Sequence, residues 1–429
     1  MIPPTPGMAS IRRVRRLIFW LATVTGTPQS QPNVDPNALI ALAAKRIEAG
    51  VDGQRRFACD ASIARESYHI VEIGQTRSVL WRDRLRVEVA VFDGRQFFSW
   101  PGTGTFRFVG LEEMTGGGAS GSGDFGPFAA SFLADSDPAS VQFRGVGEWA
   151  GRRIAEYSYD VPLVGSHYEV KAGPDRFERT AYRGSMFVDA ETGDLRRLVI
   201  HVPWPPAGSG VLRAEVDTSY ESQGSSGGLF PSASTLTLTL NGGGEAINRT
   251  TYRGCHVFSS ESTIRFETSS GAARQAEEAV APSRVPAGLE VRSTMITPID
   301  SRTASAGDLF EARVVDPVRQ DRQIVVPKGA VLHGRIVELE QRYYPGVSVR
   351  VMLKFDSVEF GGRSVPITLA ARATIPAPLY GNSQSSSRAV SPVTPSEPED
   401  HGEHIASIWV FGKDRIRFDT HTSMRWETR

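Results

Sequence analysis

The sequence predicts a mainly β protein, with an N-terminal curved antiparallel sheet (a half-barrel) carrying one or two helices and a smaller C-terminal β-barrel or sandwich module. Runs of alternating apolar and polar residues recur along the chain, and turn residues separate them. The chain has 429 residues, more than a single hydrophobic core usually holds. A polar stretch rich in alanine and proline at 268–286 indicates a linker between two modules.

These composition changes predict the organisation of the chain. We expect a signal peptide at 1–30, an antiparallel β domain at 31–267, the linker at 268–286 and a second β domain at 287–429. Within the second domain, residues 376–403 are rich in serine and proline, which predicts a mobile loop.

The start of the chain indicates export. A basic cluster comes first, then the apolar run 17–24, then a polar stretch; the cluster consists of Arg12, Arg13, Arg15 and Arg16. This order is typical of a secretory signal peptide. The run is shorter than the roughly 20 residues that span a bilayer. We expect a periplasmic or secreted protein of the bacterial cell envelope, with no integral membrane segment after signal cleavage. The alternative is a basic, poorly ordered N-terminus.

One helix and two hairpins stand out. Asp35 and Pro36 suit the start of a helix, and Gly50 suits its end. Residues 78–100 form the clearest hairpin, with apolar side chains alternating towards an Asp-Gly turn. Residues 185–202 form another, which turns at Thr-Gly-Asp.

The chain contains two cysteines, Cys59 and Cys255. In an exported protein an isolated pair predicts one disulfide. Closing so long a loop would stabilise the fold by roughly 5 kcal/mol in the chain-entropy model. We then expect the two residues on adjacent strands or on a strand facing a neighbouring segment, with Cα atoms within about 7 Å. Two separate buried thiols are the alternative.

The sequence offers no motif for catalysis. Lysine plus arginine equals aspartate plus glutamate at 48 each, so charge gives no argument for a nucleic-acid partner. No nucleophile elbow stands between a strand and a helix. His401 and His404 flank a carboxylate, but they lie in the polar loop, where solvated side chains are expected. We expect neither an enzyme nor a cofactor or metal site.

Two tryptophans are candidates for the rim of an apolar cleft. Trp100 and Trp204 lie at hairpin ends beside prolines. The apolar faces of the N-terminal strands could line such a cleft, although packing in an ordinary core explains them equally.

The second module resembles the β domain of TrbI-type conjugation and type IV secretion channel subunits. The resemblance rests on Pro286-Ala287-Gly288, on 307–310 and on Pro327-Lys328-Gly329 with the strand that follows. It implies a β-barrel-like fold. Channel subunits carry an N-terminal transmembrane helix and a proline-rich stalk, and we expect neither in this chain. They also carry a membrane-inserting helical antenna, and the hydrophilic loop 376–403 takes its place here. The resemblance therefore does not imply a pore.

The first module resembles the LolA-type fold of periplasmic lipoprotein carriers. The resemblance rests on the long hairpins that follow one helix and on residues 182–198, a strand, an acidic turn with glycine and a basic strand. It implies a curved sheet with an apolar concave face. Another β-sandwich or barrel is the alternative.

These observations favour a non-enzymatic exported cell-envelope protein that binds a lipid, a lipoprotein or another apolar ligand in its N-terminal module. Two alternatives stay open. One is a structural or docking component of an envelope or secretion assembly, whose partner is another envelope protein. The other is a secreted hydrolase with an unrecognised site.

Overall fold

The structure is a computed structural model of the chain. It describes the following residues: 34–54, 56–71, 76–92, 95–107, 111, 114, 132, 135, 140–173, 176–223, 228–257, 265–267, 284–374, 407–420 and 422–429. The chain divides into two compact units, residues 1–35 and 36–429, and everything below concerns the second. The expected signal peptide, most of the linker and the expected mobile loop lie outside the described residues.

The first element is helix α1 (Pro36–Gln54). It begins at the expected proline, and its stripe of Leu39, Ala43 and Ile47 is buried against the sheet. The expected end at Gly50 is wrong, because the helix continues to Gln54. A glycine inside a helix costs only about 1 kcal/mol, which the packing of the apolar stripe offsets.

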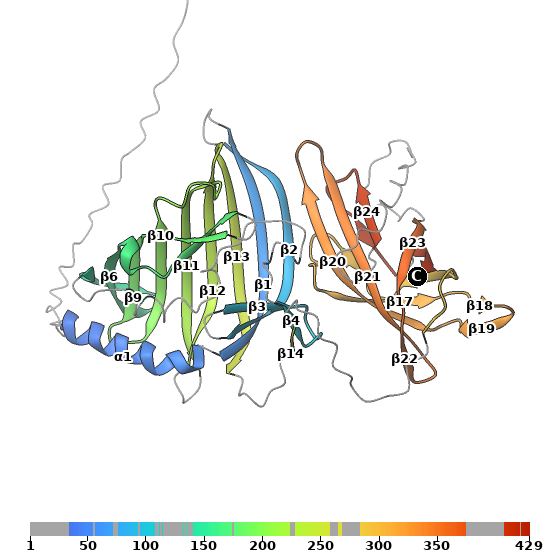
Figure 1. Cartoon of the computed structure of the whole chain (residues 1–429), viewed down its shortest axis with the longest axis horizontal. Coiled ribbons are helices and arrows are strands. Elements are labelled where there is room, and N and C mark those ends of the chain that lie inside the picture. Colours follow the sequence, from blue (N-terminus) through green and yellow to red (C-terminus); the bar gives the residue numbers. More distant parts are fainter. Residues whose placement is uncertain are drawn as a thin grey trace, which may run out of the picture. The chain divides into compact units, whose positions relative to one another are not determined.

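The N-terminal module is a curved antiparallel sheet (Figure 1). Its spatial order is β5–β6–β9–β10–β11–β12–β13–β1–β2, with β3 paired to the second half of β2. Its strands are β1 (Arg56–Val71), β2 (Thr76–Phe92), β3 (Arg95–Ser99), β4 (Thr105–Arg107), β5 (Gln142–Trp149), β6 (Arg152–Val161), β9 (Tyr182–Asp189), β10 (Leu195–Val202), β11 (Val211–Gln223), β12 (Gly228–Leu240), β13 (Gly244–Val257) and β14 (Arg265–Glu267). Along the chain, β6 is followed by a 3-10 turn η2 (Leu163–Gly165) and then by the hairpin of β7 (Glu169–Gly173) and β8 (Arg176–Arg179), before β9 begins.

Strand alternation gives this sheet one apolar inner face. On β1 the residues Phe57, Cys59, Ala61 and Ile63 are buried. They oppose a buried row on β2, consisting of Val91, Val89, Val87 and Leu85. Leu111, from the segment that follows β4, packs on the same cluster. Both the alternation and the β2–β3 hairpin agree with the sequence analysis.

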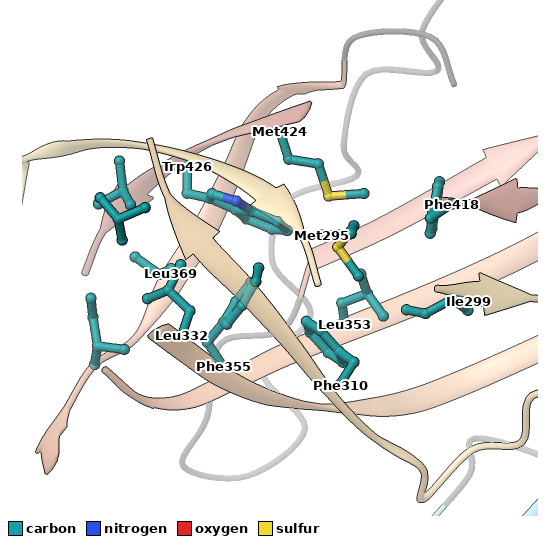
Figure 2. Packing of buried hydrophobic residues seen from close by; sticks show 14 of the residues in the cluster. Met295, Ile299, Phe310, Leu332, Leu353, Phe355, Leu369, Phe418, Met424 and Trp426 are labelled. Carbon is teal, nitrogen blue, oxygen red and sulfur yellow. The ribbon is translucent and has the colours of Figure 1, made fainter. Parts of the chain in front are cut away.

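The C-terminal module is a second, strongly bent antiparallel sheet in the order β23–β26–β15–β17–β20–β21–β24. Its strands are β15 (Glu290–Met295), β16 (Ile299–Asp300), β17 (Leu309–Val314), β18 (Val318–Gln320), β19 (Gln323–Val326), β20 (Val331–Arg342), β21 (Ser348–Phe360), β22 (Arg363–Pro366), β23 (Leu369–Thr374), β24 (Ser407–Phe411), β25 (Arg417–Phe418) and β26 (Ser423–Thr428). Its core centres on Trp426, which packs edge-on against Phe355 and Trp409 (Figure 2).

The two modules share one continuous sheet. The edge of β2 pairs with β20 over residues 81–83, and the Tyr343 N–H donates to the Leu80 carbonyl at 2.8 Å. Further along β2, Ala306 exchanges backbone hydrogen bonds with Arg84 and Arg86 at 2.8 and 2.7 Å. The edge of β2 is therefore covered at residues 80–92 by three different segments.

Three arginines strengthen this junction. They alternate along β2, and each reaches the C-terminal module. Arg82 Nε donates to Gln341 Oε1 at 2.5 Å, Arg84 donates to the carbonyl of Arg302, and Arg86 forms an ion pair with Asp308 at 3.2 Å.

The predicted fold class, mainly β with a curved N-terminal antiparallel sheet and a smaller C-terminal β module, is confirmed. Among the helices of the described residues, none has the length and apolar character to cross a bilayer.

Candidate functional site

One end of the N-terminal sheet is closed by packing. The turn between β9 and β10 lies there, and α1 runs along the same end (Figure 1). The side chain of Leu42 packs against Gly193 in this turn, and Arg46 pairs with Asp194 at 3.9 Å. Helix α1 therefore covers this end of the sheet.

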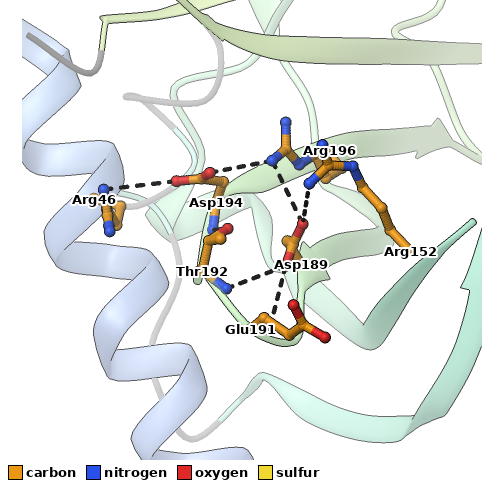
Figure 3. A network of polar contacts seen from close by, with 7 residues as sticks. All are labelled: Arg46, Arg152, Asp189, Glu191, Thr192, Asp194 and Arg196. Carbon is orange, nitrogen blue, oxygen red and sulfur yellow. Dashed lines mark hydrogen bonds and ion pairs between the residues drawn. The ribbon is translucent and has the colours of Figure 1, made fainter. Parts of the chain in front are cut away.

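A buried carboxylate organises that turn (Figure 3). Asp189 Oδ1 accepts the backbone N–H groups of Glu191 and Thr192, both at 3.1 Å. Its Oδ2 receives Arg152 at 3.1 Å and Arg196 at 3.4 Å. Burial alone would raise the pKa of Asp189, but these donors outweigh it and hold the pKa below its usual value.

The opposite end of the sheet displays apolar side chains. The end of β6, the end of β10 and the start of β11 meet there, because β6, β9, β10 and β11 are consecutive antiparallel strands. Val164 is 97% exposed and Trp204 is 78% exposed, and Leu163 and Leu212 are also exposed. We call these four residues the apolar rim.

Hydrogen bonds hold the two main loops of the rim in place. The Ser166 N–H donates to the Leu163 carbonyl at 3.3 Å and closes the 3-10 turn. Ser166 Oγ donates to the Thr180 carbonyl at 2.7 Å, and Thr180 Oγ1 donates to the Trp204 carbonyl at 3.3 Å. Thr180 therefore joins the loop of Leu163 and Val164 to the loop of Trp204.

Asp135 holds the loop of Leu163 and Val164 in place through His167. Its carboxylate accepts the His167 N–H at 2.9 Å, the Tyr182 hydroxyl at 2.9 Å and His167 Nδ1 at 2.5 Å. The Asp135 side chain is fully buried. Burial, followed by the charge of Asp135, raises the pKa of Tyr182, so its hydroxyl remains a donor.

The Asp135–His167 pair is the arrangement that most resembles catalytic machinery in the described residues. A carboxylate at Nδ1 orients an imidazole so that Nε2 can act as a base. A nucleophile must then lie within reach of Nε2. The neighbouring Ser166 hydroxyl is buried and donates to the Thr180 carbonyl instead. Asp135 also accepts the His167 N–H and the Tyr182 hydroxyl, and these bonds hold the loop in place.

An ion pair crosses the inner face of the sheet. Arg65 on β1 lies opposite Asp83 on β2, and Arg65 Nε donates to Asp83 Oδ1 at 2.9 Å. Asn248 on β13 lies opposite Arg65 on its other side. On the next two strands the same row continues with Leu236 and Val216. Along this one row the inner face changes from apolar at β11 and β12 to polar at β13, β1 and β2.

The two cysteines lie on neighbouring strands and form a disulfide. Cys59 is on β1 and Cys255 is on β13, with Cα atoms 4.2 Å apart. Both are buried beside Phe57 and Phe230. The bond lies at the point where the register of the β1–β13 pair shifts.

The structure places the two candidate tryptophans in different surroundings. Trp204 belongs to the apolar rim. Trp100 is half-buried, packs on the cluster under β1 and β2, and lies close to Gly307 of the C-terminal module. Because β11, β12, β13 and β1 lie between β10 and β2, the two residues are not brought together. A common rim formed by both stays a prediction.

Sequence reasoning missed Leu163, Val164 and Asp135. A usable signal existed for the first two, since apolar residues between Pro162 and Gly165 stand in a turn, where polar residues are expected. Asp135 had no such signal, because its partners come from distant parts of the chain. In the described part of the chain, no three histidine, cysteine or acidic residues are grouped to hold a metal ion. His401 and His404 lie outside that part.

No family model and no curated protein matches the chain. Among solved structures, it is similar to a LolA-superfamily protein from Nitrosomonas europaea, with 10% identity, a TM-score of 0.25 and coverage of 51% of this chain and 94% of that one. It is similar to a putative outer membrane lipoprotein-sorting protein domain from Vibrio parahaemolyticus, with 10% identity, a TM-score of 0.27 and coverage of 53% and 93%. It is also similar to ComB10 of the Com type IV secretion system of Helicobacter pylori, with 11% identity, a TM-score of 0.19 and coverage of 34% of this chain and 86% of that one. TM-scores this low carry no conclusion about a ligand or partner.

Proposed function

We propose that this chain is a non-enzymatic cell-envelope protein whose N-terminal module binds a lipid, or the acyl part of a lipoprotein, at the apolar rim. The observation that carries the proposal is the exposure of Val164 and Trp204 on two loops that Thr180 links at one end of the sheet. Exposed apolar side chains gathered in one place mark interaction sites. Here the loops that carry them are held by Thr180 and by buried Asp135, so the display is built into the fold.

The surroundings of the rim support an apolar ligand. The inner face beneath it is apolar at Val202, Ala214 and Leu238, which lie opposite one another on β10, β11 and β12. Helix α1 covers the other end of the sheet. The basic and apolar start of the sequence and the disulfide support a location outside the cytoplasm.

Binding of the fluorescent fatty acid cis-parinaric acid to the full chain tests the proposal. We expect saturable binding that Val164→Ser and Trp204→Ser each weaken about tenfold, the value of one buried apolar side chain. Ile324→Ser is the matched control, since Ile324 is an exposed apolar residue of the C-terminal module. It should leave the affinity unchanged. Absent binding, or equal losses in all three variants, would contradict the proposal.

Strand β5 favours a second candidate function, docking within an envelope assembly. Among the described strands β5 pairs with β6, and every side chain along it is exposed or half-exposed. These include Phe143, Val146 and Trp149. Unpaired strand edges are templates for pairing with another chain. An oligomer of the full chain that Val146→Lys abolishes in light scattering would favour this role.

A further inference from the structure

The C-terminal module also displays apolar side chains, at the turn between β20 and β21. Tyr344 is 71% exposed and Val347 is 46% exposed. The pairing of β20 with β2 fixes where this turn lies. Arg342 is opposite Trp81, and the Tyr343 N–H binds the Leu80 carbonyl, so the turn projects beyond the first residues of β2.

This turn and the apolar rim lie at the same end of the continuous sheet. The start of β2 is at the end of the sheet where β10 finishes and β11 begins, because every pair from β10 through β2 is antiparallel. Six strand spacings separate β10 from β20, or about 29 Å measured along the sheet. The β2–β20 pairing and the junction arginines join the two modules, so both sets of apolar tips lie at one end of the same sheet.

Four turns at this end contain no charged residue: 162–166, 203–210, 241–243 and 343–347. The connection between β1 and β2 carries Glu72, and the segment after β24 carries Lys413 and Asp414. The β9–β10 turn at the opposite end carries Glu191 and Asp194. Uncharged tips lose little hydration energy when they leave water, whereas charged tips would resist the transfer.

The chemistry of the tips matches the surface of a lipid bilayer. Tryptophan and tyrosine combine an apolar ring with a polar group and are enriched at membrane–water boundaries. Aliphatic Leu163, Val164 and Val347 accompany them. A single acyl chain could occupy the rim but could not reach both sets of tips, whereas a flat lipid surface contacts both at once.

We propose that this end of the sheet docks on a lipid bilayer, with Trp204 and Val164 of the first module and Tyr344 and Val347 of the second entering the interfacial layer. The proposal rests on the proposed function in one respect, since the ligand-binding rim would then face the membrane that holds its ligand. Tyr344 and Val347 form no part of the rim, so the two proposals can fail separately.

Co-sedimentation of the full chain with sucrose-loaded vesicles of phosphatidylcholine tests the docking. We expect binding that persists in high salt, because the four turns that would enter the bilayer carry no charge. The double variant Tyr344→Ser/Val347→Ser should lower the partition coefficient roughly tenfold. The same variant should leave cis-parinaric acid binding unchanged. Trp204→Ser should lower both, and Ile324→Ser should lower neither.

A second readout does not depend on affinity. Brominated phosphatidylcholine quenches a tryptophan that enters the bilayer, so the intact chain should lose more fluorescence than Trp204→Phe does. Absence of vesicle binding, loss of binding in high salt, or an unaffected Tyr344→Ser/Val347→Ser variant overturns the docking proposal. Vesicle binding without any binding of cis-parinaric acid overturns the proposed function and leaves the docking proposal supported.

Discussion

Arg65 and Asp83 lie opposite each other on β1 and β2 and form an ion pair whose side chains are 2% and 6% exposed. Burial raises the pKa of Asp83, and the nearby Glu340 adds to this, against the opposing effect of Arg65. Charges removed from water need each other, because either one alone would be left without a counter-charge in a medium that solvates it poorly.

Removing one partner of this pair should therefore be far more damaging than removing both. We expect Arg65→Met to lower the free energy of unfolding by about 3–5 kcal/mol, and Arg65→Met/Asp83→Leu to recover a large part of that loss. Urea unfolding measures both. The more exposed pair of Arg249 on β13 and Glu66 on β1 is the control, and Arg249→Met should cost less than about 1 kcal/mol. Equal costs for Arg65→Met and Arg249→Met would contradict the prediction.

The lowered pKa of Asp189 leads us to expect that acid destabilises the turn between β9 and β10. Because its pKa in the folded protein lies below the ordinary value of 3.8, the folded state holds the proton less readily than the unfolded chain does. Its stabilisation is complete above that ordinary value and is lost as the pH falls through the lower folded value. Asp189→Asn should therefore destabilise the protein more at about pH 6 than at about pH 2. Urea midpoints that shift equally at both pH values would show that the carboxylate charge plays no part.

The close approach of Gly307 to the backbone of Arg86 leaves no room for a side chain at the module junction. A Cβ atom there would lie 2.1 Å from the Arg86 carbonyl oxygen, at a φ of +97°. Gly329 has a similar φ of +89° but no neighbour within 4 Å, so Gly329→Ala measures the backbone strain alone. We expect Gly307→Ala to cost about 1–3 kcal/mol more than Gly329→Ala, because the junction must open to admit the methyl group. Thermal unfolding of the two variants compares them, and equal melting temperatures would mean that the junction yields freely.

The disulfide predicts a large loss of stability on reduction. The bond joins residues separated by 196 positions. Removing both sulfur atoms in Cys59→Ser/Cys255→Ser should lower the free energy of unfolding by about 5 kcal/mol in the chain-entropy model. Protein made in an oxidising compartment should also migrate faster in non-reducing electrophoresis than after reduction. Two free thiols in an Ellman titration of that material would rule out the bond.

The sequence analysis predicted local patterns well and long-range neighbours poorly. Alternation identified the buried face of β2 at Leu85, Val87, Val89 and Val91, because a strand of period two can bury only one side. The alternating Arg82, Arg84 and Arg86 bind the second module. Alternation shows which residues leave the core but says nothing about what lies beyond it.

The same limit applies to the candidate site. Trp204 stands out in the sequence from its place at a hairpin end beside prolines, and the structure shows it largely exposed there. Leu163 and Val164 form too short a run for any periodicity to emerge. The residues that fix their loop are Asp135 and Thr180, which lie well away in sequence from the groups that they bind. Such contacts follow from tertiary packing, which a local sequence pattern does not show.

The covered edge of β2 bears on how the chain can be divided. A fragment that stops at residue 267 would leave the backbone groups of residues 80–86 facing water in a straight row, ready to pair with the same edge of another molecule. Exposed edges of this kind drive aggregation. The second module therefore covers an edge of the first that would otherwise be free to pair with another molecule. The smallest fragment that stays soluble on expression should contain both modules.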